Sequence, residues 1–129
     1  MTAVSLPNSV TSVGELSFGD ASALTSFSAP GLVTIGNNSF YNNANLTSSI
    51  NLPNVTTIGG SGFYNCQKLT SMTIGPNISS IGSSAFNKCQ NLKDLTIMKT
   101  MDEVKAMANY SWSLTSGCVI TCTDGEIII

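Results

Sequence analysis

The side chains that could carry chemistry in this 129-residue sequence are few, and histidine is absent from it. Of the four cysteines, Cys66 and Cys89 stand 23 positions apart, and Cys118 and Cys122 stand four apart. A structural zinc site takes four Cys or His ligands, and these spacings fit no zinc finger or ribbon. A cysteine nucleophile needs a neighbouring base or cation, which the "FYNC" segment around Cys66 lacks. We therefore expect Cys66 and Cys89 to be buried, reduced thiols acting as small apolar side chains, and we expect no metal or other cofactor.

The acidic residues do not form a catalytic pair either. Without histidine no Ser–His–Asp or Cys–His arrangement can form. A glycosidase would need two facing carboxylates, but three of the acidic residues fit helix-cap or turn positions and the others are scattered. The acidic residues are Glu15, Asp20, Asp94, Asp102, Glu103, Asp124 and Glu126. We predict that the protein is not an enzyme.

The composition also excludes several classes of partner. Charged residues make up only 9% of the chain, the net charge is −2, and the five basic residues are all lysines. Nucleic-acid binding requires a basic face, so no nucleic acid is expected. No apolar run reaches the roughly 20 residues of a membrane helix, so membrane insertion is not expected. No signal peptide is visible at the N-terminus. We expect a virion or intracellular protein, or a cell-surface one if the sequence belongs to a longer secreted chain.

A repeat of 22 to 23 residues organises most of the chain. The segments "SVGELSFGDASAL", "TIGNNSFYNNANL", "TIGGSGFYNCQKL" and "SIGSSAFNKCQNL" begin at residues 12, 34, 57 and 80. Self-similarity at this period is typical of leucine-rich solenoids, in which each coil buries its apolar residues against the next. Four apolar or small columns recur, and a glycine follows the first of them: Val or Ile with its Gly, then Phe, then Ala, Asn or Cys, then Leu. They are Val13, Ile35, Ile58, Ile81; Gly14, Gly36, Gly59, Gly82; Phe18, Phe40, Phe63, Phe86; Ala21, Asn43, Cys66, Cys89; and Leu24, Leu46, Leu69, Leu92.

Each column has an expected place in the coil. The glycine indicates a corner that needs a positive φ or a close backbone approach. The phenylalanines should stack on the convex side, where a short helical or 3₁₀ turn is expected. A strand follows each leucine and ends at a proline, and a second short strand follows the proline. In "LTSSINLPN" (46–54) the apolar Ile50 and Leu52 fall one step late, which predicts a bulge or a shifted strand.

The repeat unit Leu-x-x-Φ-x-Φ-Pro-Asn-x-Val-Thr-x-Ile-Gly-x-x-x-Phe-x-x-Cys-x-x-Leu (Φ is apolar) resembles the BspA-like leucine-rich repeats, over residues 6 to about 98. The resemblance implies a right-handed solenoid used for binding, without catalytic residues, as found in bacterial surface adhesins, phage-encoded proteins and some protozoa. The cysteine is missing from the first two repeats. The tail is similar to that of BspA-like proteins of gut bacteria and their phages.

The last thirty residues differ from the repeat. Thr100 and Glu103 form a capping box, and a helix is expected over 101–110, lying on the last coil. Asp124-Gly125 supplies a two-residue type I′ turn, which predicts a hairpin over 118–129 with Cys122 opposite Ile127. Cys118 and Cys122 would then lie too far apart along one strand for a disulfide.

The sequence thus predicts a mainly β solenoid of about four repeats with a C-terminal cap. Residues 1–98 form the coil, with repeats near 6–28, 29–51, 52–74 and 75–98, and residues 99–129 form the cap, a helix and a hairpin.

Function in such a solenoid is expected on the outward side of its strands, which we call the strand face. Its small hydroxyl side chains suit a protein or a surface glycan, and tyrosine or tryptophan can supply binding energy. The strand-face residues are Thr25, Ser26, Ser28, Thr47, Ser48, Thr70, Ser71, Thr73, Lys93, Asp94 and Thr96. The possible aromatic anchors are Tyr41, Tyr64, Tyr110 and Trp112.

Three functions remain open from the sequence. The first is a non-catalytic recognition module, phage- or bacterium-encoded, that binds its partner through the strand face. The second is a virion or assembly subunit that packs against copies of itself through the N-terminal coil and the C-terminal hairpin, because exposed strand edges invite pairing. The third is a phage-encoded inhibitor that binds a host or defence protein.

Overall fold

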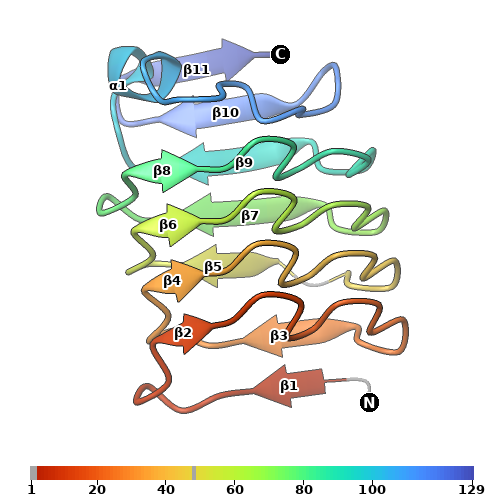
Figure 1. Ribbon diagram of the computed structural model, residues 1–129. Helices are drawn as coiled ribbons and strands as arrows, with labels where there is room; N and C mark the ends of the chain where they lie inside the picture. The colour runs from red at the N-terminus through yellow and green to blue at the C-terminus, as the bar shows by residue number, and fades with distance from the viewer. Residues whose placement is uncertain (1–2, 48) are drawn as a thin grey trace.

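The computed structural model describes residues 3–47 and 49–129 and shows a solenoid of stacked coils (Figure 1). The strands of one side are β1 (Ala3–Ser5), β3 (Ser26–Ser28), β5 (Ile50–Leu52), β7 (Ser71–Ile74), β9 (Asp94–Ile97), β10 (Val119–Cys122) and β11 (Gly125–Ile128). The opposite side carries the two-residue strands β2 (Ser12–Val13), β4 (Thr34–Ile35), β6 (Thr57–Ile58) and β8 (Ser80–Ile81), and one helix, α1 (Met101–Lys105), follows β9.

The predicted solenoid is confirmed, with about five turns rather than four. The four short strands form one parallel sheet in the order β2-β4-β6-β8, and the longer strands pair in the orders β1-β3 and β5-β7-β9-β10. The extra turn arises because β1 stands ahead of the first repeat and β10 continues the sheet after the last one (Figure 1). The apolar columns fill one continuous core between the two sides, with Leu46, Leu69 and Leu92 fully buried.

The predicted strand shift in the second repeat is confirmed. Ile50 pairs with Met72 and Leu52 with Ile74, and all four side chains are buried. The extra residue between Leu46 and Ile50 is therefore taken up before the strand begins, and the inward register is kept.

The glycine column serves close approach of the backbone. None of its four members has a positive φ, but a Cβ on Gly82 would lie 2.3 Å from the backbone nitrogen of Gly60 in the preceding coil. On Gly36 it would lie 2.9 Å from the backbone nitrogen of Glu15. The glycines are therefore required by close backbone approach and not by a positive φ.

The convex loops consist of successive turns rather than the helical or 3₁₀ turn expected there. Each turn is closed by one backbone hydrogen bond, such as that from Gly19 N–H to Leu16 O (3.0 Å). Residues with positive φ, such as Asn38 and Asn42, separate them. Inside the loops the phenylalanine column stacks as predicted, with ring centroids 5.0 Å apart for Phe40 and Phe63.

The predicted helix over 101–110 is wrong in length. The capping box of Thr100 and Glu103 is present, but the helix ends at Lys105. The following residues form the last convex loop instead, where the Phe86 N–H donates to Trp112 O (3.1 Å) as Phe63 N–H does to Ala85 O (2.9 Å). Asn109 and Trp112 have positive φ, which a right-handed helix cannot accommodate.

The predicted hairpin is present, but its register is wrong. Ile120 pairs with Ile127 and Cys122 with Gly125, so the turn falls on Thr123 and Asp124. The Asp124 carboxylate accepts the Met101 N–H at the start of α1 (2.8 Å), which fixes Asp124 in the turn's second position. The strand β10 also pairs in parallel with β9, so the hairpin extends the solenoid sheet instead of lying across its end.

Candidate functional site

The strand face is built from side chains that alternate outward along successive strands. One row across the paired strands runs Asn51, Thr73, Thr96, Thr121, because these residues are register partners. The parallel row is Ser71, Asp94, Val119, and the Ser49 hydroxyl is hydrogen-bonded to that of Ser71 at its start. Since neighbouring strands lie about 4.8 Å apart, small polar groups repeat along the solenoid on a flat sheet surface.

The structure brings most of the predicted strand-face residues together. Ser26 and Ser28 lie on β3, Ser71 and Thr73 on β7, and Asp94 and Thr96 on β9, all half-buried or exposed. Ser48 lies outside the described residues.

The remaining four predicted residues precede the strands and mark where each coil enters the sheet. The Thr47 N–H donates to Thr25 O (3.0 Å), and the Lys93 N–H donates to Thr70 O (3.2 Å). The Lys93 ammonium donates to Ser116 O in the following coil (3.3 Å).

The strand face also includes polar residues that the sequence did not assign to it, among them Ser49, Asn51 and Thr121. Ser49 and Asn51 occupy it because the shifted strand turns Ile50 and Leu52 inward. Thr121 occupies it because β10 pairs with β9. The shift was visible in the sequence and could have placed Ser49 and Asn51, whereas the parallel pairing of β10 had no such signal.

Tyr41 and Tyr64, two of the possible aromatic anchors, form a two-ring ladder on the convex loops. Their rings stack at 4.7 Å with an interplanar angle of 6°, and both side chains are half-buried. The Lys88 ammonium lies 5.5 Å from the centre of the Tyr64 ring, within range of a cation–π contact. The ladder lies on the loops, away from the strands, so it forms a surface separate from the strand face.

Trp112 is a core residue, which removes it from the candidate anchors. It is 1% exposed, and its indole N–H donates to Ala108 O (3.0 Å). Tyr110 is half-buried and packs edge-on against Trp112 at 5.5 Å. The sequence did not reveal that "NYSWSL" forms the last coil's loop, where the tryptophan fills the end of the core.

The cysteine column serves hydrogen bonding between coils. Each side chain donates to the phenylalanine carbonyl of the preceding coil: Asn43 Nδ2 to Phe18 O (2.7 Å), Cys66 Sγ to Phe40 O (3.3 Å) and Cys89 Sγ to Phe63 O (2.9 Å). The first coil has no preceding phenylalanine, and its residue at this position is alanine. A thiol and an amide are therefore interchangeable here because both donate.

All four cysteines are free and buried, as expected for Cys66 and Cys89. The neighbouring Cys89 thiol and burial together raise the pKa of Cys66. Burial, with a contribution from Asp94, raises the pKa of Cys118 to about 11. Both groups are therefore protonated at neutral pH and poor nucleophiles.

We expect a thiol-reactive chromophore to label none of the buried cysteines in the folded chain at pH 8, and all four in denaturant.

Because Cys118 is more acidic in the unfolded chain than in the folded one, its contribution to stability is complete below its ordinary pKa of 9.0 and is lost as the pH rises towards 11. Urea titrations across this range check the loss. The raised pKa of Cys66 gives a loss in the same direction, so Cys118→Ala should make the decline shallower without abolishing it, and an unchanged profile would contradict the assignment.

Within the described residues, no group of three or more His, Cys, Asp and Glu could hold a metal ion. No helix in this part of the chain is both long and apolar enough to cross a membrane.

Comparison with known proteins gives one family. The profile described as a BspA type leucine rich repeat region, in six copies, matches residues 1–115. No curated protein matches the chain.

Three solved structures share the fold. A leucine-rich repeat protein from Bacteroides ovatus superposes with a TM-score of 0.79 at 25% identity, over 95% of this chain and 30% of that one. The pneumococcal vaccine antigen PcpA gives 0.75 at 26% identity, over 95% and 31%. A leucine-rich repeat protein of T. pallidum gives 0.56 at 20% identity, over 93% and 68%, and supports the fold alone. The chain thus spans about a third of the length of the first two structures.

Proposed function

Because the chain belongs to the BspA-type leucine-rich repeat family, we propose that it is a non-catalytic binding module that recognises a protein partner through its strand face. The observation that supports this is the unbroken row Asn51, Thr73, Thr96, Thr121. A rigid sheet holds these short side chains in place, so a partner gains hydrogen bonds without ordering long, flexible groups.

The chemistry of the strand face favours a neutral, polar partner surface. The row offers hydroxyls and one amide, which both donate and accept hydrogen bonds. Beside this row, Lys93 and Asp94 are adjacent in sequence and their charges largely cancel, while Glu126 on β11 adds a negative charge at the edge of the strand face. The binding surface would therefore discriminate by shape and hydrogen bonding more than by charge.

Paired substitutions test the assignment. Replacing both Thr73 and Thr96 by lysine places two long cations in the centre of the strand face. Replacing Thr34 and Ser80, which are exposed on the opposite sheet, adds the same charge elsewhere. In pull-downs from bacterial and host-cell lysates, we expect the control variant to capture the same partners as the wild type. The strand-face change should weaken their binding by about tenfold or more.

Equal thermal stability of the two double variants is the condition for reading this experiment. Partners that are lost with Thr34→Lys and Ser80→Lys but kept with Thr73→Lys and Thr96→Lys would place recognition on the opposite side and refute the proposal.

A further inference from the structure

The two ends of the longer-stranded side are sheet edges, and their backbone groups are arranged alike. At the N-terminal end, Val4 pairs with Phe27 and the Leu6 N–H donates to Ser28 O (2.8 Å). Val4 and Leu6 thus direct their backbone groups towards β3. Because this direction alternates along a strand, Ala3 and Ser5 direct theirs to the open side.

At the C-terminal end the same reasoning applies to β11. The Ile129 N–H donates to Cys118 O (2.9 Å), and Ile129 O accepts the Gly117 N–H (2.8 Å). Ile129 and Ile127 therefore face β10, and Glu126 and Ile128 direct their N–H and C=O groups away from it. Unpaired strand edges of this kind are templates for pairing with another chain.

The side chains on the two edges agree with the backbone. Ala3, Ser5, Glu126 and Ile128 are exposed on the strand-face side. Val4 packs against the core, and Ile127 belongs to it. Antiparallel pairing of β11 with β1 of another copy, Ile128 opposite Ala3 and Glu126 opposite Ser5, therefore places Ile127 opposite Val4. The core-facing side chains of the two molecules then lie next to each other. Ile128, which is 76% exposed in one molecule, becomes part of a sheet that continues into the next molecule.

Two features disfavour contact between two N-terminal ends. In the convex loops each coil donates to the next, as Phe18 N–H does to Ser39 O (2.8 Å). In the first coil the matching carbonyl oxygens are those of Glu15, Ser17 and Gly19, and within the described residues they accept no hydrogen bond. At a contact between two N-terminal ends, these acceptors would face the same acceptors of the other copy.

Charge points the same way. Lysine is absent from residues 1–67, where Glu15 and Asp20 are the acidic residues. A contact between two N-terminal ends therefore brings like charges together, whereas the C-terminal end offers Lys99 and Lys105 among its acidic residues Asp102, Glu103, Asp124 and Glu126.

We infer that a second copy of this chain occupies these edges, so that β11 of one molecule pairs antiparallel with β1 of the next. This contact joins unlike surfaces and does not close on itself, so it generates linear head-to-tail assemblies. It leaves the strand face uncovered and aligns it from copy to copy, and it is independent of the proposed binding function.

Proline at a position whose backbone N–H points to the open edge removes the hydrogen-bond donor that the contact needs. The hydrogen bonds inside the molecule stay intact. Ser5→Pro blocks the N-terminal edge and Ile128→Pro the C-terminal edge, with Ser5→Ala and Ile128→Thr as controls that retain the N–H. Glu126→Pro is a second block of the C-terminal edge, should Ile128→Pro unfold. Light scattering and sedimentation velocity of the full chain give the mass across a wide concentration range.

We expect the mass of the wild type and of both controls to grow with concentration beyond a dimer. Each proline variant alone should stay monomeric, and an equimolar mixture of Ser5→Pro with Ile128→Pro should give a dimer, since one intact edge of each kind remains. A monomeric wild type at every concentration would overturn the inference. Dimers of Ser5→Pro alone would overturn it in favour of pairing between two C-terminal ends, and dimers of Ile128→Pro alone in favour of two N-terminal ends.

Discussion

Phe63→Ala should lower the free energy of unfolding by about 3–5 kcal/mol, the usual cost of removing a buried phenylalanine. The ring is fully buried in the middle of the stack, 5.0 Å from Phe40 and 6.1 Å from Phe86. Its removal leaves a cavity that separates two coils. Because each coil is stabilised by its neighbours, the loss acts on the coils at both sides.

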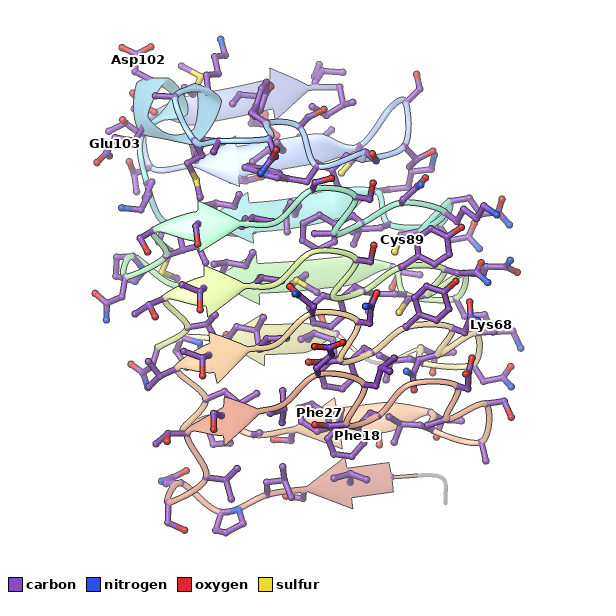
Figure 2. The ribbon with its side chains drawn as sticks, viewed as in Figure 1. Phe18, Phe27, Lys68, Cys89, Asp102 and Glu103 are labelled. Atoms are coloured by element: carbon purple, nitrogen blue, oxygen red, sulfur yellow. The ribbon has the colours of Figure 1, made fainter. Side chains whose placement is uncertain are left out.

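Phe18→Ala is the matched control, since Phe18 occupies the first position of the same column and is half-buried. It stacks on Phe40 alone along the column (5.4 Å) and meets Phe27 edge-on (5.2 Å); Figure 2 labels Phe18 and Phe27. We expect a smaller loss, about half that of Phe63→Ala, measured as the shift of the urea midpoint at constant slope. A larger loss for Phe18→Ala would contradict the description of one continuous core.

Gly59→Ala should be destabilising by about 1–3 kcal/mol or more, although it adds a single methyl group. That methyl would lie 2.4 Å from the Asn37 backbone nitrogen and 2.6 Å from the Gly36 carbonyl carbon. Both atoms belong to the backbone of the preceding coil, which cannot yield as a flexible side chain would. The two coils would have to move apart at this corner and lose contacts along the stack.

Gly60→Ala is the control, one residue along the same coil. A Cβ on Gly60 would lie 3.6 Å from Ser83 O, which is an ordinary van der Waals contact. The Gly60 N–H can still donate to Asn37 Oδ1 (2.8 Å). Thermal unfolding should place this variant within about 0.5 kcal/mol of the wild type, as for most surface changes. Equal destabilisation by both alanines would show that the close approach at Gly59 is not what requires glycine.

The repeated part of the fold was predictable because each column has one physical role. The phenylalanine stack, the strand ends at proline and the shifted strand at Ile50 followed from residue type and spacing. The tail was harder to predict because tertiary contacts there outweigh local preference. Asp124-Gly125 favours a type I′ turn in isolation, yet Asp124 bonds to the Met101 N–H and moves the turn one position back.

The positions of the strand-face residues could be predicted in part, from the alternation of side chains along a strand. Alternation along β7 and β9 placed Thr73 and Thr96 on the strand face, and it failed for Asn51 only because the shift was not applied to the outward residues. Trp112 was misjudged because nothing in "NYSWSL" resembles the repeat, although its backbone completes the last loop through the bond with Phe86.

The most direct test of the strand face as a recognition surface is site-specific photo-crosslinking to a captured partner. A benzophenone side chain is introduced at Thr73 in one variant and at Thr34, on the opposite sheet, in another. The proposed function predicts a covalent adduct with the partner from position 73 and none from position 34. An adduct from position 34 alone would contradict it and place binding on the opposite side of the solenoid.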